Sequence, residues 1–360
     1  MFLRSLSLVN FKNYRKAAYH FDQRIVCFTG LNGMGKTNLL DAIYTLCLSK
    51  SYFSSTEAQN ILHGEDFFRL DAKIERQKEE HTLKCVYQKG KRKELEKDGL
   101  KYEKLTEHVG QFPVVIITPD DNQLINGGSE ERRRFLDSLL SQLDNQYLYN
   151  LQAYLKLIEQ RNSFLKRMAE QAYFDASLLA TYDGQLEPFA MYIFKSRKEI
   201  IQELEPVFNQ LYQMLCDARE QVKLAYKSDL LDAPLPELLL GAREIDRLLK
   251  RTNKGVHRDD MLFEINDFGA KQFGSQGQQK SFLIAMKLAQ YHLLRQQKGI
   301  KPLLLLDDIF DKLDAERCAN LLGHIQGQDY GQIFITDTQR ERLEKLFPDT
   351  SQVAFYEVKQ

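Results

Sequence analysis

The chain has 360 residues, of which 43% are hydrophobic, enough to build one large two-lobed domain or two smaller domains. Its 50 basic and 50 acidic residues balance, so the overall charge neither demands nor excludes a polyanionic partner, and any nucleic-acid surface must be local. No apolar run approaches the roughly 18 residues that a membrane-spanning helix requires. We therefore expect no membrane-spanning helix, and no membrane is among the expected partners.

The cysteines and the first residues indicate the compartment. Five cysteines lie in apolar or helical contexts without C-x-x-C spacing, which predicts reduced thiols in a cytoplasmic protein and no metal site built from them. They are Cys27, Cys47, Cys85, Cys216 and Cys318. The first fourteen residues, MFLRSLSLVNFKNY, alternate apolar and polar side chains. This pattern predicts a first strand and not a signal peptide.

Strand-like runs dominate the chain up to about Thr118. The expected strands are Leu3 to Val9, Ile25 to Thr29, Leu70 to Ile74, Thr82 to Tyr87 and Val114 to Thr118. The second of these runs leads into GLNGMGKT, residues 30–37, which has the spacing G-x-x-x-x-G-K-[ST]. Helical spacing of apolar residues follows from Asn38 to Leu48. A strand before the loop and a helix after it favour a phosphate-binding loop over an ordinary glycine-rich turn.

Each residue type in this loop suits a nucleotide. Glycines allow the backbone N–H groups to turn around a pyrophosphate, Lys36 supplies a cation for the β- and γ-phosphates, and the Thr37 hydroxyl can bind Mg²⁺. The expected nucleotide-binding residues are Gly30, Leu31, Asn32, Gly33, Met34, Gly35, Lys36, Thr37 and Asn38. The expected cofactors are therefore ATP and Mg²⁺.

The pattern changes to long helices between Asp120 and about Lys250. Apolar residues recur at steps of three and four from Leu136 to Ile158, and Pro188, Pro206 and Pro234 are expected to divide the later segments. A strand-like MLFEI, a Gly/Gln-rich turn and a helix from Lys280 to Gln296 follow.

The Gly/Gln-rich turn reads FGSQGQQK, residues 273–280. Ser275, Gly277 and Gln278 precede an apolar helix, so they are candidates for a second phosphate-binding site. Because Lys36 already serves one phosphate site, a second one suggests that two chains share their nucleotides. The alternative is a Gly/Gln loop without a ligand.

Two further buried strands are expected at residues 302–307 and 332–337. The first reads PLLLLD and continues into Asp308, so two carboxylates stand at the carboxyl end of a buried strand, where ligands gather in open α/β sheets. Asp307 is expected to bind Mg²⁺ and Asp308 to orient or deprotonate the attacking water, which with Lys36 makes them the candidate catalytic residues. A strand-end aspartate that caps the next helix is the alternative.

Together these motifs resemble the ABC-type ATPase heads of the structural-maintenance-of-chromosomes and Rad50 group. Asp311 to Asp314 then resembles a D-loop, and Ser275 to Gln279 a variant signature motif. More specific stretches resemble the RecF family of recombination mediators: LSLVNFKNYR near the start, TPDDNQLINGGSEERRRFLD at 118–137, LIEQRNSFLK at 157–166 and GVHRDD at 255–260. The resemblance extends from residue 1 to about residue 340.

The resemblance implies an α/β ABC-type P-loop ATPase head with a mostly helical second lobe. The first lobe is expected at residues 1–118 and 295–360, and the second at 119–294, with the signature motif. Ser275 lies 239 residues after Lys36, which is too short a separation for long coiled-coil arms, so the inserted helices must form a compact lobe.

The family also implies a function and partners. RecF proteins bind DNA in an ATP-dependent manner, act at single-strand gaps during recombinational repair and fork maintenance, and help RecA loading with RecR and RecO. A weak DNA-stimulated ATPase and an ATP-induced homodimer are expected. An ATPase cassette coupled to transport and a P-loop metabolite kinase are the alternatives, the first needing a membrane partner and the second a further substrate pocket.

Some positions depart from the family pattern. Asp308 stands where transporter cassettes carry Glu, Val256 where RecF proteins usually carry Pro, and the switch position reads Thr336-Asp337-Thr338 without a histidine. The sequence does not assign the glutamine-loop residue, for which Gln123, Asp120 and Asp121 are candidates.

Candidate DNA contacts are clusters of basic residues, each of which could equally be a solvated face. They are Lys89, Lys91, Arg92 and Lys93; Arg132, Arg133 and Arg134; Lys195, Arg197 and Lys198; and Lys250, Arg251, Lys254 and Arg258. For Arg132 to Arg134, packing or internal salt bridges are a second alternative.

Overall fold

The computed structural model describes residues 1–171, 175–216, 220–310, 314–347 and 350–359. The chain folds as two compact units. Unit 1 comprises Met1–Asp121, Leu211–Ala218 and Lys280–Gln360, and unit 2 comprises Asn122–Gln210 and Arg219–Gln279. Relative to the expected lobes, residues 119–121, 211–218 and 280–294 are grouped with the strands of unit 1.

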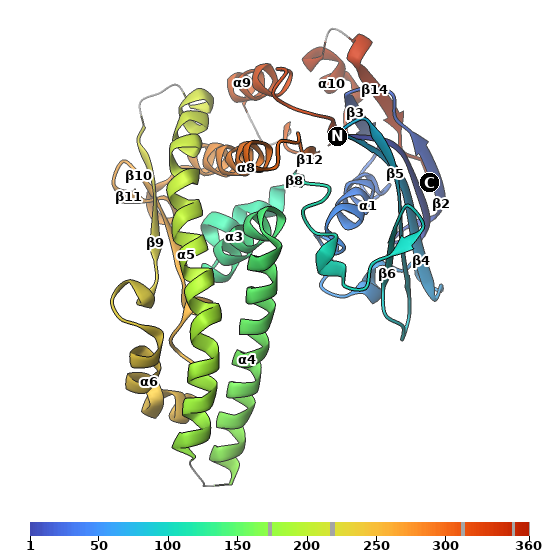
Figure 1. The fold of residues 1–360 in the computed structure, drawn as a ribbon. Coiled ribbons are helices and arrows are strands. Elements are labelled where there is room, and N and C mark those ends of the chain that lie inside the picture. The colour runs from blue at the N-terminus through green and yellow to red at the C-terminus, as the bar shows by residue number, and fades with distance from the viewer. Residues whose placement is uncertain (172–174, 217–219, 311–313, 348–349, 360) are drawn as a thin grey trace. The chain divides into compact units, whose positions relative to one another are not determined.

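Unit 1 contains a parallel sheet in the order β14-β3-β13-β12-β8. Figure 1 labels β14, β3, β12 and β8. Its strands are β14 (Val353–Glu357), β3 (Ile25–Thr29), β13 (Ile333–Asp337), β12 (Leu303–Asp307) and β8 (Val114–Ile117). Strands β3, β13, β12 and β8 are buried at every residue, which explains why their sequences are apolar runs and not alternating patterns. The expected strands at 25–29, 114–118, 302–307 and 332–337 are confirmed.

An antiparallel sheet forms the other layer of unit 1, in the order β2-β1-β4-β5-β6-β7. Its strands are β1 (Phe2–Phe11), β2 (Tyr14–His20), β4 (Phe67–Arg76), β5 (Glu79–Gln88), β6 (Glu94–Lys97) and β7 (Leu100–Lys101). In β4, buried and more exposed residues alternate, as expected for a sheet with one face on the core. The start of the chain is therefore a strand, as the alternation predicted.

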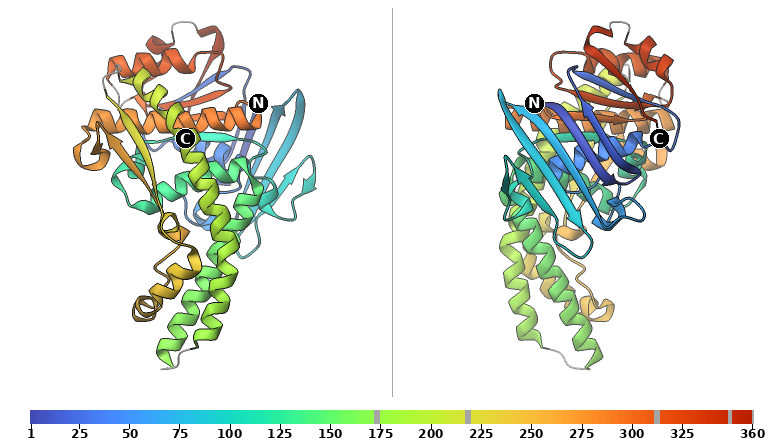
Figure 2. Two further views of the ribbon diagram at one scale, coloured as in Figure 1. Left: turned by 60° about the vertical axis from the view of Figure 1, so that its left-hand side comes forward. Right: turned by 90° about the vertical axis from the view of Figure 1, so that its right-hand side faces the viewer.

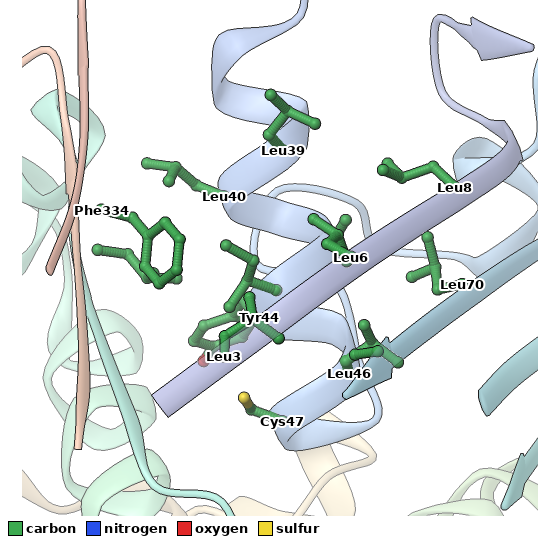
Figure 3. Close-up of a cluster of buried hydrophobic side chains, with 14 of the residues drawn as sticks. Leu3, Leu6, Leu8, Leu39, Leu40, Tyr44, Leu46, Cys47, Leu70 and Phe334 are labelled. Atoms are coloured by element: carbon green, nitrogen blue, oxygen red, sulfur yellow. The ribbon is translucent and has the colours of Figure 1, made fainter. Parts of the chain in front are cut away.

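Helix α1 (Lys36–Leu48) supplies the core of this unit. Apolar side chains of α1 meet those of β1, β4 and β13 in one buried cluster (Figure 3). Leu39, Leu40 and Leu46 are at most 1% exposed. Because the helix that begins at Lys36 is buried along most of its length, the loop before it is held at a fixed place on the sheet.

Unit 2 contains most of the helical part of the chain, with a short sheet in the order β11-β10-β9. The elements are α2 (Gln123–Asn126), α3 (Ser129–Leu143), α4 (Asn145–Glu170), α5 (Ala176–Leu215), β9 (Val222–Lys227), α6 (Leu235–Leu249), β10 (Asp260–Ile265), β11 (Phe268–Gly269) and α7 (Ala270–Phe273). The end of α5, from Leu211, is grouped with unit 1. Helices α4 and α5 lie side by side as a long hairpin (Figures 1 and 2). Two more helices, α9 (Ala315–Ile325) and α10 (Arg340–Leu346), belong to unit 1.

Helix boundaries differ from the expected ones in three places. The pattern from Leu136 to Ile158 is broken at Asp144, which caps α4 by accepting a hydrogen bond from Gln146 N–H at 2.8 Å. Helix α5 continues through Pro188 and Pro206. Helix α8 (Gln276–Lys298) begins four residues before Lys280, so Gly277 and Gln278 lie in its first turn and not in a preceding loop. Within the described residues, no helix combines the length and apolar composition needed to cross a membrane.

Candidate nucleotide-binding site

The phosphate-binding loop has the backbone that its glycines predict. Gly30, Gly33 and Gly35 have φ values of +142°, +83° and +102°. A Cβ at Gly30 would lie 2.7 Å from the Val358 carbonyl oxygen, and one at Gly35 would meet the Asn13 side chain. These two positions therefore require glycine for space as well as for conformation.

Lys36 is held inside the loop. Its ammonium donates hydrogen bonds to the carbonyls of Gly30 at 2.8 Å and Leu31 at 3.0 Å, and the residue is 4% exposed. The charge therefore lies against the carbonyl groups at the start of the loop. Leu31 is itself 74% exposed, and Asn32 and Gly33 are exposed as well, so the tip of the loop is open to solvent.

The β1–β2 turn braces the loop, a contact that motif spacing did not predict. Asn13 donates from Nδ2 to the Met34 carbonyl at 3.0 Å and accepts at Oδ1 from Asn38 Nδ2 at 2.7 Å. The Tyr14 hydroxyl donates to the Gly35 carbonyl at 3.1 Å. The only signal in the sequence was that Asn13 and Tyr14 belong to the N-terminal stretch that resembles the RecF family.

Thr37 and Asp307 come together although 270 residues separate them. The Thr37 hydroxyl lies 2.9 Å from Oδ1 and 3.1 Å from Oδ2 of Asp307. Burial raises the pKa of the Asp307 carboxyl above its ordinary value, while hydrogen bonds from Thr336 and Thr37 act in the opposite direction. A hydroxyl and a carboxylate this close offer the hard oxygen ligands that Mg²⁺ prefers.

Asp308 follows Asp307 at the end of β12 and is less buried. Its backbone is in the left-handed region, with φ of +46°. The next residues of the motif, 311–313, lie outside the described part of the chain, so the expected D-loop is represented by Asp314 alone, which caps α9 by accepting from Arg317 N–H at 2.9 Å.

The signature residues form the start of α8. Ser275 Oγ accepts from Gln278 N–H at 3.2 Å, and Gln278 Oε1 accepts from Ser275 N–H at 2.6 Å, a reciprocal capping box. Ser275 is exposed and Gly277 is partly exposed. The structure thus brings Lys36, Thr37, Asp307 and Asp308 together in unit 1, while Ser275, Gly277 and Gln278 belong to unit 2.

Two other candidate positions are now defined. Asp121, a glutamine-loop candidate, is buried and accepts from Lys287 and Thr118, whereas Asp120 and Gln123 are exposed. Asp337, at the switch position, accepts from Gln339 N–H at 2.8 Å. Its carboxylate thus stabilises the turn that precedes α10.

Several basic residues in the candidate DNA clusters are internal. Lys93 donates to Glu57 and to the Ser49 carbonyl, Arg132 pairs with Asp260 at 2.6 Å, and Arg197 is 2% exposed. Arg197 pairs with Asp137 at 2.8 Å and Asp259 at 3.0 Å. Salt bridges were the second alternative for Arg132 to Arg134, and they account for Arg132. The cluster residues that remain exposed are Lys89, Lys91, Arg92, Arg134, Lys195, Lys198, Lys250, Arg251 and Arg258.

Comparisons with known proteins agree over the whole chain. Residues 2–360 match the RecF/RecN/SMC N-terminal domain family. A protein named DNA replication and repair protein RecF from Flavobacterium johnsoniae is 47% identical, with 98% of each chain covered, and its namesake from Cytophaga hutchinsonii is 42% identical, with 96% of this chain and 92% of that protein covered.

Solved structures give the same result. The recombination mediator protein RecF-ATPrS of the RecFOR pathway superposes with a TM-score of 0.89 at 26% identity, covering 99% of this chain and 96% of that chain. An Smc head domain from Pyrococcus furiosus superposes with a TM-score of 0.57 at 14% identity, covering 99% of this chain and 94% of that chain, which supports the fold alone. The fold is that of an ABC-type ATPase head, and the chain belongs to the RecF/RecN/SMC family and, within it, to the RecF proteins.

Proposed function

We propose that this protein is an ATP-driven DNA-binding switch of recombinational repair and replication-fork maintenance. The observation that carries the proposal is the 2.9 Å contact between the Thr37 hydroxyl and Asp307 Oδ1. It joins the end of the phosphate-binding loop to the carboxylate edge of β12, the two parts that ATP with Mg²⁺ requires. The relatives named RecF, and a neighbouring structure described as RecF-ATP, support this choice of nucleotide.

Each part of the site has a proposed role. The backbone from Gly30 to Asn38 surrounds the phosphates, and Lys36 neutralises the β- and γ-phosphates. Thr37 and Asp307 would hold Mg²⁺, which when bound would neutralise charge on the phosphate oxygens. Asp308 orients the attacking water. Because its side chain is one methylene shorter than that of a glutamate, we expect slow turnover, and membership of the RecF family adds the expectation that DNA stimulates it.

The signature residues act on a second copy of the chain. Ser275 is exposed at the N-terminus of the 23-residue helix α8, where the positive end of the helix dipole favours an anion. Ser275, Gly277 and Gln278 would contact the γ-phosphate held by the partner, so ATP would close a homodimer and hydrolysis would open it. The proposed functional lobes are residues 1–118 with 295–360, and residues 119–294.

Dimer closure would gather the exposed basic residues onto one DNA-binding side. Because the net charge is zero, DNA contact requires several such patches at once. We propose gapped DNA with single-stranded and duplex parts as the ligand, RecR as the direct partner, RecO and RecA in the same pathway, and the cytoplasm as the location. A transport cassette is not favoured, because the relatives reported above match this chain almost end to end under the name RecF.

A direct test measures the oligomeric state and DNA retention together. Light scattering after size exclusion should change from monomer to dimer when ATP and Mg²⁺ are added, and fluorescence anisotropy should show gapped-DNA binding that depends on both. Asp307→Asn is the matched control and should lose both responses. DNA affinity that is the same with and without ATP would contradict the switch.

A further inference from the structure

Thr336 connects the two carboxylate residues of the site. It lies on β13, the strand between β12 and β3, and is paired in register with Asp307 on one side and Phe28 on the other. This parallel register places its side chain beside the end of β12. Thr336 is fully buried.

The Thr336 hydroxyl acts both as a hydrogen-bond donor and as an acceptor. It donates to Asp307 Oδ1 at 2.7 Å and accepts from the Asp308 N–H at 3.0 Å. Thr37 also lies nearer to Oδ1 of Asp307 than to Oδ2. The two threonines therefore fix the orientation of the carboxylate and leave Oδ2 the less engaged oxygen.

The second hydrogen bond acts on a backbone that needs support. Asp308 has φ of +46°, in the left-handed region that residues with a Cβ adopt only occasionally. Its N–H is shared between the Thr336 hydroxyl and the Thr336 carbonyl, which lies 3.3 Å away. The Thr336 hydroxyl and carbonyl thus hold the Asp308 backbone at the point where the chain leaves the sheet. They thereby fix the position from which the Asp308 side chain extends.

We propose that Thr336 is a positioning residue that sets the orientation of Asp307 toward Mg²⁺ and of Asp308 toward the attacking water. This inference rests on the ATPase function proposed above. The Thr336 hydroxyl would contact both Asp307, the metal ligand, and Asp308, the residue that orients the water. Both residues would then be positioned by β13. Only the hydroxyl can do this, since a valine has the same shape and β-branching and would fit β13 equally well.

The competing explanation is that the hydroxyl is a buried polar group that only stabilises the sheet. Thr45 provides a matched control for that explanation. It is also fully buried in unit 1, on the helix that follows the phosphate-binding loop, but its hydroxyl has no hydrogen-bond partner among the described residues. The same threonine-to-valine change can therefore be made with and without loss of the two contacts.

The experiment compares Thr336→Val, Thr336→Ser and Thr45→Val in the full-length protein. Steady-state assays with ATP, Mg²⁺ and gapped DNA give kcat and KM. Electron paramagnetic resonance of Mn²⁺, titrated in the presence of a non-hydrolysable ATP analogue, gives the affinity for the metal without turnover. Thermal denaturation without nucleotide gives the stability of each variant.

Thr336→Val should lower kcat about tenfold or more, the usual consequence of losing a hydrogen bond to a charged group, with a smaller change in KM. It should also weaken Mn²⁺ binding severalfold. Thr336→Ser should keep kcat and Mn²⁺ affinity within about threefold of the wild type, because it retains the hydroxyl. Thr45→Val should change neither quantity.

Two results would overturn the inference. One is Thr336→Val with wild-type kcat and Mn²⁺ affinity. The other is Thr336→Ser as defective as Thr336→Val, which would make the methyl group the important part. If Thr336→Val does not fold, the serine variant and Thr336→Ala still decide, because alanine lacks the hydroxyl and serine has it. A wild-type protein that does not bind Mn²⁺ with the nucleotide would instead refute the proposed function itself.

Discussion

The Lys287 ammonium lies 2.7 Å from Asp121 Oδ1, and both residues are almost fully buried. Lys287 also donates to the Tyr52 hydroxyl at 3.1 Å, and Asp121 accepts from Thr118 N–H at 2.7 Å. The pair joins helix α8 to the segment after β8 within unit 1. Buried ion pairs of this kind are costly to break singly, because the remaining charge has no counterion.

Replacing Lys287 by methionine should therefore destabilise the protein. We expect the free energy of unfolding to fall by about 3 kcal/mol, because the Asp121 carboxylate would stay buried without its cation. Urea denaturation followed by circular dichroism measures the change. Adding Asp121→Asn should recover more than half of the loss, since the amide carries no charge. Lys91→Met, at an exposed lysine, is the control and should change stability by no more than about 0.5 kcal/mol.

His108 predicts a loss of stability in mild acid. Its Nε2–H donates to the Leu46 carbonyl at 2.7 Å, and its Nδ1 has no hydrogen-bond partner among the described residues. Burial lowers the pKa of His108 to about 4, from an ordinary value of 6.5. The unfolded chain therefore takes up a proton first as the pH falls, and this contribution to stability is lost between pH 6.5 and about pH 4.

The expected slope for this one histidine is about 1.4 kcal/mol per pH unit within that window. His108→Asn should reduce the slope by that amount, whatever its effect on stability at pH 7.5. Denaturation at a series of pH values measures it. A variant whose stability depends on pH as steeply as that of the wild type would show that His108 is not kept neutral by burial.

Features that neighbouring residues specify could be predicted from the sequence. The phosphate-binding loop and the strand end at Asp307 could be predicted, because each is specified by neighbouring residues. The capping box between Ser275 and Gln278 also has a sequence signature, S-x-x-Q before an apolar run. This signature predicts that α8 starts directly after Ser275.

Contacts between residues far apart in the sequence could not be predicted in this way. Thr336 reaches Asp307 only through the register of two parallel strands, and Lys287 reaches Asp121 across 166 residues of chain. Helix α5 continues past Pro188 because buried residues on both sides, such as Leu186 and Ala190, hold the helix by packing. Local propensity is overridden at such places.

Lys36→Ala should weaken ATP binding at least tenfold. Charge-assisted hydrogen bonds to phosphate contribute roughly 1.5 to 3 kcal/mol each, and Lys36 is the cation held inside the loop. Equilibrium titration with a fluorescent ATP analogue measures the loss, and Lys16→Ala, at an exposed lysine on β2, should have no effect. Unchanged affinity in the Lys36 variant would remove residues 30–37 from the nucleotide site.

The two carboxylates should separate binding from turnover. Asp308→Asn should keep ATP and Mg²⁺ bound but slow hydrolysis, so that the ATP-held dimer accumulates. Asp307→Asn should instead weaken Mg²⁺ binding, because it removes the carboxylate beside Thr37. Single-turnover hydrolysis and Mg²⁺ titration distinguish the two. Normal turnover in Asp308→Asn would mean that another residue orients the water, with Gln123 the next candidate.

Ser275 decides whether the catalytic site is shared between two chains. Ser275→Arg should leave ATP binding by the monomer nearly normal, because the phosphate-binding loop is unchanged. It should block ATP-induced dimerisation by adding bulk at the proposed interface, and ATP-dependent DNA retention should fall with it. Because the substitution also removes the cap of α8, Ser275→Ala is the matched control. The alanine variant loses the cap without adding bulk.

Mixing Ser275→Arg with Lys36→Ala gives the sharpest result. In a mixed dimer with shared sites, one site combines both defects, while the other combines the intact loop of the Ser275 variant with the intact signature residues of the Lys36 variant. The mixture should therefore recover ATPase activity that neither variant has alone, and the activity should be greatest near equal amounts of the two. If both variants are folded and the mixture stays inactive at every ratio, Ser275 must act within its own chain, and the shared-site mechanism is wrong.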